Sequence, residues 1–241
     1  MRNVWWILRR DLGAYLRSPM GYIIIAIVLA ANGLLFNIWA VGSGSARSEE
    51  VLSRFFWHAS GINAVACIFL SMRLLAEEKQ LGTITLLATS PVKDYQLVLG
   101  KFLSGLSFVG LMTALTIYMP LLIYINGRVS LAHLAAGYLG LMLLSGAVMA
   151  IGLFCSALAP NQLVALILGA FTVLLFWLFW LISKVASPPV EDVIAYLSLH
   201  DKHFRPFMRG VVSVQDVVFY ISLSYVALLA SVRVLESRRW Q

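Results

Sequence analysis

Two histidines and an aspartate near residue 200 are residues of the kinds that bind metals or transfer protons. His200, Asp201 and His203 lie close together in the chain, so they could form a metal site or an acid–base pair. Their spacing fits helix-based zinc ligation poorly, and the sequence places no further ligand cluster nearby. We therefore interpret the two histidines as exposed loop residues and expect no metal site.

A second candidate is the dipeptide Gly100-Lys101, which matches the end of a phosphate-binding loop. The full motif G-x-x-x-x-G-K-[ST] requires glycine at position 95 and serine or threonine at position 102. The chain has Tyr95 and Phe102 there, so the motif fails twice. We expect neither catalysis nor a bound cofactor in this chain.

The composition indicates which solvent surrounds the elements that carry these residues. The chain has 241 residues, of which 61% are hydrophobic and 12% charged, and its mean hydropathy is +0.87. A soluble domain is about one quarter charged. The net charge of +7 could suggest nucleic acid, but the basic residues form short clusters between long uncharged stretches. We expect an integral membrane protein that binds no nucleic acid.

Six stretches are long and apolar enough, or nearly so, to cross a bilayer, which takes about 20 residues of helix. They cover residues 21–40, 55–72, 102–125, 134–158, 162–183 and 217–232. The second and sixth stretches are short and end at Arg73 and Arg233, whose long side chains would reach the interface. The fold class predicted is therefore all-α, with six transmembrane helices.

The distribution of basic residues predicts the orientation of these spans. With six spans, both termini share one side of the membrane, and that side holds eleven of the 18 Lys and Arg residues. The eleven are Arg2, Arg9, Arg10, Arg17, Arg73, Lys79, Lys93, Lys101, Arg233, Arg238 and Arg239. The other seven lie on the opposite side, so we expect both termini to be cytoplasmic.

Two of the segments outside the spans have their own character. Residues 1–19 place Val4, Leu8, Leu12 and Leu16 at helical spacing, which predicts an amphipathic helix lying in the cytoplasmic interface. A plain basic tail that sets topology is the alternative. Residues 184–216 form the longest external segment, which opens with two prolines.

The spans themselves hold almost no ionisable residue. Ion-coupled transporters generally bury such residues at mid-membrane. The helices offer small residues such as Gly137, Gly146 and Gly152, which favour close helix packing. Cys67 and Cys155 fall inside apolar stretches and are interpreted as buried free thiols. A transport pathway between such spans has almost no ionisable residue to couple it to an ion gradient, so its energy must come from another component.

Residues 73–101, between the second and third spans, form the most informative segment. Gly82-Thr83 would end one helix and begin a short one near residues 83–89. Ser90 and Pro91 would cap and start the next helix, whose first turn Asp94 favours. A short helix between two turns suits docking into a groove on a cytoplasmic protein. The alternative is an interfacial connector that binds nothing.

Three ordered motifs carry a resemblance to a known family. From Arg73 the chain reads R-L-L-x-E-E-K-x-x-G-T-x-x-L-L-x-T-S-P-V, followed by L-G-K. From Leu197 it reads L-S-x-x-x-x-H-F-x-x-F-x-x-G-V, followed by D-V-V-F-Y, and it closes with R-V-L-E-S-R-R-W. These motifs resemble ABC type-2 permeases, particularly the gliding-motility-type branch. Thr85 departs from the pattern, since the family often has Glu there.

The resemblance implies a single permease domain over residues 1–241, with a coupling helix in 73–101 and short external helices in 184–216. It assigns ATPase coupling to Glu77, Glu78, Gly82, Thr83, Leu86, Leu87 and Pro91. It assigns an external motif to His203, Phe204, Phe207 and Gly210. The implied location is a bacterial inner membrane.

The implied partners are two cytoplasmic ATPase subunits, which would carry ATP and Mg²⁺, and a second permease copy or a related membrane subunit. In some members that subunit bears a large external domain. The function expected is therefore an ATP-driven export permease that is not itself an enzyme. One alternative is a force- or signal-transmitting component that moves no cargo. Another is an ATP-independent channel or secondary transporter, which the missing buried charges disfavour.

Overall fold

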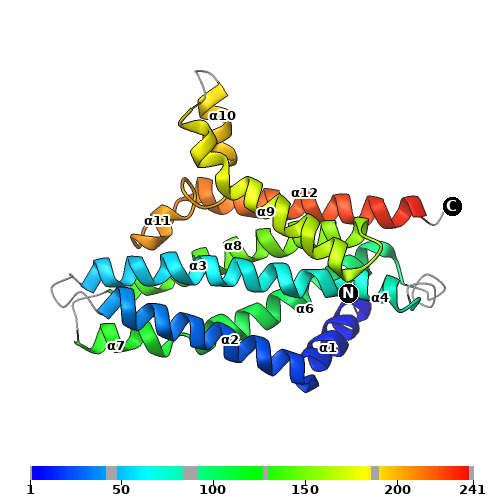
Figure 1. Cartoon of the computed structure of the whole chain (residues 1–241), viewed down its shortest axis with the longest axis horizontal. Helices are drawn as coiled ribbons and strands as arrows, with labels where there is room; N and C mark the ends of the chain where they lie inside the picture. The colour runs from blue at the N-terminus through cyan, green and yellow to red at the C-terminus, as the bar shows by residue number, and fades with distance from the viewer. Residues whose placement is uncertain (1, 42–47, 84–91, 127–129, 186–189, 239–241) are drawn as a thin grey trace.

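The computed structural model describes residues 2–41, 48–83, 92–126, 130–185 and 190–238. All the regular structure in these residues is helical (Figure 1), which confirms the predicted fold class. Within these residues, six helical stretches are long and apolar enough to cross a membrane, as predicted. They are Pro19–Ile38, Ser48–Gln80, Asp94–Ile125, Leu131–Leu158, Gln162–Ser183 and Val214–Ser237.

Two of these helical stretches are much longer than the apolar runs that predicted them. The second, expected to be short over residues 55–72, lies in a helical stretch of 33 residues, Ser48–Gln80. The sixth, expected over 217–232, lies in one of 24 residues, Val214–Ser237. The apolar run marks only the part that hydrocarbon surrounds, whereas the backbone stays helical into the polar ends.

Helix α8 (Leu131–Leu158) forms the centre of the bundle and is largely buried, with α3 (Ser48–Leu74) packed against it. Glycines make this contact close. A Cβ atom added at Gly152 would lie 2.1 Å from the Ser71 hydroxyl oxygen, and one added at Gly137 would lie 2.2 Å from the Phe56 ring. Any side chain at these two positions would clash, so the small residues allow α3 and α8 to approach closely.

The third span is interrupted by its proline. Helix α6 (Asp94–Leu115) ends in a turn at Thr116 and Ile117, and α7 (Tyr118–Asn126) follows. Pro120 has no amide hydrogen to donate to Thr116, and its ring would collide with that carbonyl group. The start of α6 also corrects an expectation: the helix begins at Asp94, with Lys93 as its N-cap, and not at Pro91.

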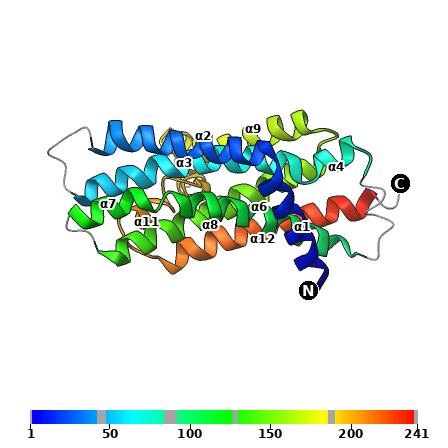
Figure 2. The ribbon, with the colours of Figure 1, turned by 90° about the horizontal axis from the view of Figure 1, so that it is seen from below.

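Helix α1 (Arg2–Arg17) is a separate helix within the segment predicted to be amphipathic. It meets α2 (Pro19–Leu35) at Ser18, whose hydroxyl caps α2 by accepting a hydrogen bond from the Met20 amide at 3.2 Å. Gly21 is required at this corner, because a Cβ atom there would lie 2.0 Å from the Tyr15 carbonyl oxygen. Helix α2 continues as a π-helix, η1 (Phe36–Val41). Figure 2 shows α1 crossing the bundle beside α6.

The C-terminal third contains α9 (Gln162–Ser183), α10 (Val190–Leu197), α11 (Arg205–Met208) and α12 (Val214–Arg238). Helices α10 and α11 are the short helices predicted between residues 184 and 216. Helix α10 packs against α9 and stands out from the side of the bundle (Figure 1). The short α11 lies against α8 and α3.

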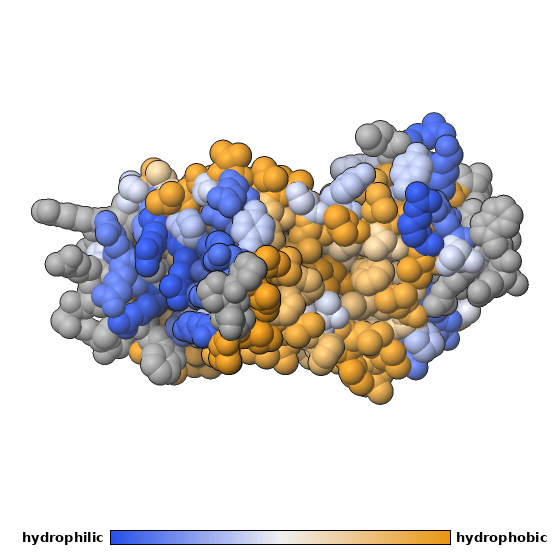
Figure 3. Space-filling view, turned by 90° about the horizontal axis from the view of Figure 1, so that it is seen from above, coloured by the Kyte–Doolittle hydropathy of each residue, from blue (hydrophilic) through white to orange (hydrophobic). Residues whose placement is uncertain are grey.

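The bundle has two ends with different contents. The terminal end carries both chain termini, α4 (Ala76–Gln80) and the last turns of α12, whereas the distal end carries α7 and α11 (Figure 1). The face in Figure 3 has an apolar band across its middle and hydrophilic residues at both ends. This pattern suits a bundle that spans a bilayer, with its two ends in water.

Candidate functional site

The candidate coupling residues lie at the terminal end, where α3 gives way to α4. Ser156, near the end of α8, holds this junction: its hydroxyl oxygen accepts hydrogen bonds from the amides of Leu75 at 3.2 Å and Ala76 at 2.9 Å. The same hydroxyl donates to the Met72 carbonyl at 3.3 Å. Amides that leave a helix break need such partners when they are buried. Helix α8 therefore fixes the direction in which α4 starts.

Lys79 of α4 makes a second connection to α8. Its ammonium donates to the carbonyl oxygens of Ala157 and Ala159, the latter at 3.1 Å. The last carbonyl groups of a helix have no partner within the helix, and a cation is favourable there. Lys79 thus caps the C-terminal end of α8 from a neighbouring helix.

The two glutamates predicted to couple to an ATPase are engaged within this chain. Glu77 accepts two parallel hydrogen bonds from the Arg73 guanidinium, both at 2.9 Å. Glu78 lies 2.8 Å from the Lys101 ammonium and 3.4 Å from the Arg10 guanidinium. Lys101 also lies 3.2 Å from Asp11, which pairs with Arg10 at 2.7 Å. These four charges, Arg10, Asp11, Glu78 and Lys101, are called the terminal network below.

The terminal network joins three helices that are far apart in the sequence, namely α1, α4 and α6. Lys101 is its centre, with only 5% of its side chain exposed. A charge this far from water needs oppositely charged partners, and the two carboxylates supply them. The second Glu78 carboxylate oxygen is buried and has no hydrogen-bond partner among the described residues.

Gly82 ends this part of the segment in the left-handed region, with φ of +71°. Its amide donates to the Lys79 carbonyl at 3.1 Å, and the Thr83 hydroxyl donates to the Glu78 carbonyl at 3.3 Å. The predicted break at Gly82-Thr83 is therefore present. Leu86, Leu87 and Pro91 lie outside the described residues, as does the predicted short helix at 83–89 beyond its first residue, Thr83.

The second group of predicted residues lies at the distal end. His203 is buried: its Nε2 atom lies 2.8 Å from the Tyr196 carbonyl oxygen, and its Nδ1 atom lies 2.6 Å from an Asp216 carboxylate oxygen. Because a carbonyl only accepts, Nε2 carries a hydrogen, and the contact at Nδ1 needs another. The imidazole and the carboxylate therefore hold these two protons between them, and the pair is electrically neutral overall. The ring stacks on Phe219, with centroids 3.8 Å apart.

Phe204, Phe207 and Gly210 lie around the same buried histidine region. Both phenylalanines are fully buried, and a Cβ atom at Gly140 of α8 would lie 2.6 Å from that of Phe207. Gly210 has φ of +78°, and a side chain there would also collide with His133. The structure therefore packs Phe204, Phe207 and Gly210 against α8, and Tyr220 joins His203 to the same cluster.

The expectation that the two histidines are exposed is wrong. His200 is also buried: it lies 2.8 Å from the Ser60 hydroxyl and stacks on Trp177, with ring centroids 4.6 Å apart. Burial lowers the pKa of His200 to about 4, although Asp201 opposes the shift. A sequence pattern of polar residues indicates a loop, but this loop folds back into the bundle. Within the described residues, no group of three or more His, Cys, Asp or Glu could hold a metal ion.

The sequence interpretation missed Asp11, Lys101 and Asp216 as partners. Asp11 is the sole acidic residue before Glu49, in a strongly basic segment, which was an available signal. Lys101 is interpreted from the sequence as a failed phosphate-loop residue and as one of the basic residues that set the orientation, although its position at the edge of an apolar run also suggests a buried pair. The spacing of Asp216 from His203 gave no sign of their contact.

Comparison with known proteins identifies the family to which this chain belongs. A search of curated proteins gives no match. A family profile described as "ABC-2 family transporter protein" matches residues 52–231, about three quarters of the chain. The matched region includes α3, α4, α6, α8 and the buried histidine region. The chain therefore belongs to the ABC-2 family of transporter proteins.

Proposed function

We propose that this protein is the membrane-spanning permease subunit of an ATP-driven ABC export transporter. A separate ATPase chain hydrolyses ATP, and residues 73–101 transmit its movement to the bundle. The complex contains two cytoplasmic ATPase subunits and a second permease copy or a related membrane subunit. The observation that carries the proposal is family membership over residues 52–231, which include the whole of the proposed coupling segment.

The terminal end is the cytoplasmic end in this proposal. Both chain termini and α4 lie there, and the positive-inside rule favours a cytoplasmic location for the side of the membrane to which the sequence assigns eleven basic residues. An ATPase on the cytoplasmic side of a bacterial inner membrane would then reach the segment after Gly82. The distal end, with His203, Phe204, Phe207 and Gly210, would face the other side of the membrane.

The contacts of α4 support a mechanical role for the segment. Helix α4 follows α3 directly, caps α8 through Lys79, and reaches α6 and α1 through Glu78. A force applied beyond Gly82 would therefore act on four helices together. Helix α8 in turn contacts α3, α9 and α12, so a small tilt at the terminal end would spread through the packed core.

The ion pairs also refine the roles proposed for the two glutamates. Because Glu77 and Glu78 are paired with Arg73 and Lys101, they orient the segment and are not free charges offered to an ATPase. Reversing either charge would place two cations side by side and misalign α4. The surface that docks on the ATPase would then be displaced without a direct contact being removed.

The test is affinity purification of the protein in mild detergent, followed by mass spectrometry and an ATPase assay. We expect a protein with Walker motifs to copurify near one to one, and Glu78→Lys to reduce the amount recovered. Glu78→Gln removes the charge without placing a cation beside Lys101 and Arg10, so it should reduce the recovery less than Glu78→Lys does. Glu50→Lys, which breaks an exposed pair with Arg54, is the matched control.

Three outcomes would oppose parts of this proposal. Recovery of the chain alone, in several detergents and without ATP hydrolysis, would contradict it and favour an autonomous channel or secondary transporter. Full recovery of the ATPase with Glu78→Lys would show that the terminal network does not orient the segment for docking. A complex that hydrolyses ATP but accumulates no cargo outside would fit the force-transmitting alternative.

A further inference from the structure

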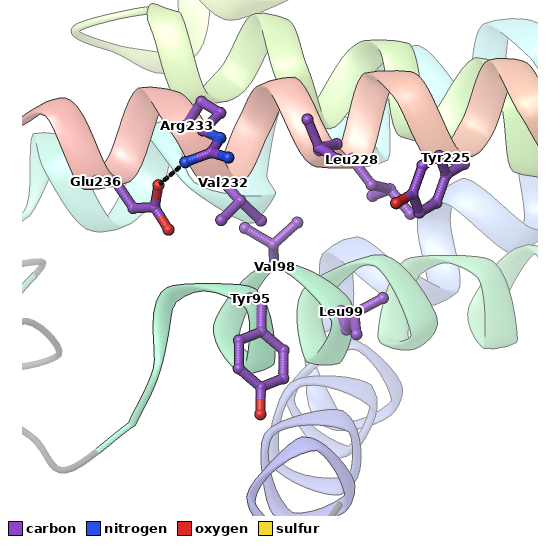
Figure 4. A pocket seen from close by; sticks show the side chains of 9 residues that line it. Tyr95, Val98, Leu99, Tyr225, Leu228, Val232, Arg233 and Glu236 are labelled. Atoms are coloured by element: carbon purple, nitrogen blue, oxygen red, sulfur yellow. Dashed lines mark hydrogen bonds and ion pairs between the residues drawn. The ribbon is translucent and has the colours of Figure 1, made fainter.

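A cavity of about 320 Å³ lies between the first turns of α6 and the last turns of α12. Figure 4 shows Val98 and Leu99 on one wall and Leu228 and Val232 on the other. Its volume is within the range of small-molecule sites. Tyr95, Val98 and Leu99 belong to the end of the proposed coupling segment, residues 73–101, but the terminal network lies on other residues of α6 and on α1 and α4.

The position of the cavity decides what surrounds it. From Tyr225 to Glu236, α12 rises about 16 Å, which is about half of a hydrocarbon core. The cavity therefore occupies the leaflet next to the terminal end. Tyr225 and Leu229 are exposed on the outer surface of α12, so the cavity opens toward lipid.

An acyl chain is the occupant that fits this opening. The lining is predominantly apolar, and hydrocarbon rather than water lies outside it. A helix with side chains is about 10 Å across, so it is too wide to enter a cavity of about 320 Å³ spread over three turns. A flexible chain of methylene groups can enter and gains free energy for each group that it buries.

The mouth of the cavity carries one positive and one negative charge. Arg233 and Glu236 are 3.1 Å apart, with 74% and 44% of their side chains exposed. Such an exposed pair contributes little stability by itself. The two side chains can therefore separate, and each can pair with a group on a ligand. The guanidinium suits two phosphate oxygens, and the carboxylate suits an ammonium group.

From this combination we propose that the cavity binds a zwitterionic phospholipid with a primary ammonium headgroup, namely phosphatidylethanolamine. One acyl chain lies against Leu99, Leu229 and Val232, the phosphate meets Arg233, and the ammonium meets Glu236. Phosphatidylglycerol carries the same phosphate but no ammonium, so Glu236 would oppose its net charge. The site does not depend on the proposed ATPase coupling.

The experiment measures which lipid the purified protein retains. The protein, with any subunits that copurify, is given equal amounts of phosphatidylethanolamine and phosphatidylglycerol with identical acyl chains, and bound lipid is counted by native mass spectrometry. We expect phosphatidylethanolamine to be retained in preference. Glu236→Gln should lower that preference about threefold while leaving lipid bound, a size expected of one exposed ion pair.

A bulky side chain in the cavity tests whether the acyl chain of the lipid binds there. Leu229→Trp should reduce bound phosphatidylethanolamine about tenfold, equivalent to excluding about two methylene groups. Ile221→Trp, at a residue 56% exposed on the same helix and outside the cavity, is the control and should retain it. Equal retention of the two lipids by the wild type would overturn the proposal, as would equal effects of the two tryptophan variants. Because Glu236→Gln changes only a surface group, its result stands even where Leu229→Trp fails to fold.

Discussion

The Lys101 ammonium lies 2.8 Å from the Glu78 carboxylate, although the two residues are separated by a long connecting segment. Lys101 belongs to α6 and Glu78 to α4, so this contact closes the base of the segment between them. Asp11 of α1 supplies the second carboxylate. The connection between the second and third spans is therefore held at its root, where a force from a partner would enter the bundle.

Removing the Lys101 charge is expected to destabilise the protein. Lys101→Met keeps much of the side-chain volume but removes the buried cation that Glu78 and Asp11 share, so that the largely exposed Arg10 is left to pair with both; we expect a cost of about 2 kcal/mol. Thermal unfolding in detergent micelles measures the change. Arg9→Met removes an exposed charge from α1 and should have little effect. Equal unfolding temperatures for the two variants would contradict a stabilising role for the network.

The sequence was sufficient to predict the spans but not the contacts between their ends. Hydrophobic length alone located all six helical stretches, because lipid allows few other arrangements of an apolar backbone. The polar residues at the ends were harder to interpret. Asp11 and Lys101 lie ninety positions apart, so only the crossing of α1 over α6 brings them together.

The histidine region shows a different limit. The polar composition around His200 and His203 favoured an exposed loop, and the structure buries both residues. Their burial depends on Trp177 and Ser60 from two other spans and on Asp216 from α12. A linear pattern contains no information on such long-range partners, and the family resemblance singled out the region without indicating its burial.

The contact between α3 and α8 can be tested at Gly152. Gly152→Ala would place a Cβ atom 2.1 Å from the Ser71 hydroxyl oxygen, so we expect a loss of about 2 kcal/mol from overpacking. Gly146→Ala is the matched control on the same helix, since its nearest neighbour would be 3.9 Å away. Adding Ser71→Gly to Gly152→Ala should recover part of the loss. Unfolding temperatures of the wild type and these three variants measure the effect. The lowest is expected for Gly152→Ala, with the double variant above it and Gly146→Ala near the wild type.

The neutrality of the His203–Asp216 pair predicts how two substitutions will differ. Asp216→Asn preserves a neutral pair and can donate to Nδ1 of His203, so we expect a cost of about 1 kcal/mol. Asp216→Leu leaves that buried nitrogen without a partner and should cost about 3 kcal/mol. Denaturation midpoints at pH 7 measure both. A leucine variant as stable as the asparagine variant would show that the contact contributes no net stability.

The buried His200 predicts a loss of stability in acid. Its pKa falls from 6.5 to about 4 in the folded protein because burial disfavours the cation. The unfolded chain therefore binds more protons than the folded one between these values, so the free energy of unfolding decreases as the pH falls through this window. We expect a decrease of roughly 2 kcal/mol between pH 7 and pH 5 from this residue.

His200→Gln provides the comparison for that pH dependence. Glutamine has no titration in this range and can still bond to the Ser60 hydroxyl. Unfolding temperatures recorded from pH 7 to pH 5 should fall less steeply for this variant than for the wild type. Parallel curves would mean that other groups cause the acid sensitivity.

Gly82 connects the described base of the proposed coupling segment to the residues that follow it. With φ of +71° it holds a conformation that strains a β-branched residue, whereas asparagine tolerates it. Among the residues that the structure describes, no atom lies within 4 Å of a Cβ placed there, so the expected effect comes from the backbone conformation. Gly82→Val should redirect the segment and lower ATPase recovery about tenfold, and Gly82→Asn should lower it little.

The same purification separates this effect from general instability. Gly13→Ala, another glycine with free space around its Cβ but without positive φ, should leave recovery unchanged. Membrane insertion and the unfolding temperature should be similar in all three variants, because the strain is confined to one exposed turn. If Gly82→Val recovers as much ATPase as Gly82→Asn, the direction in which the chain leaves α4 does not matter for coupling. In that case the contact with the ATPase would have to be made by other residues at the terminal end.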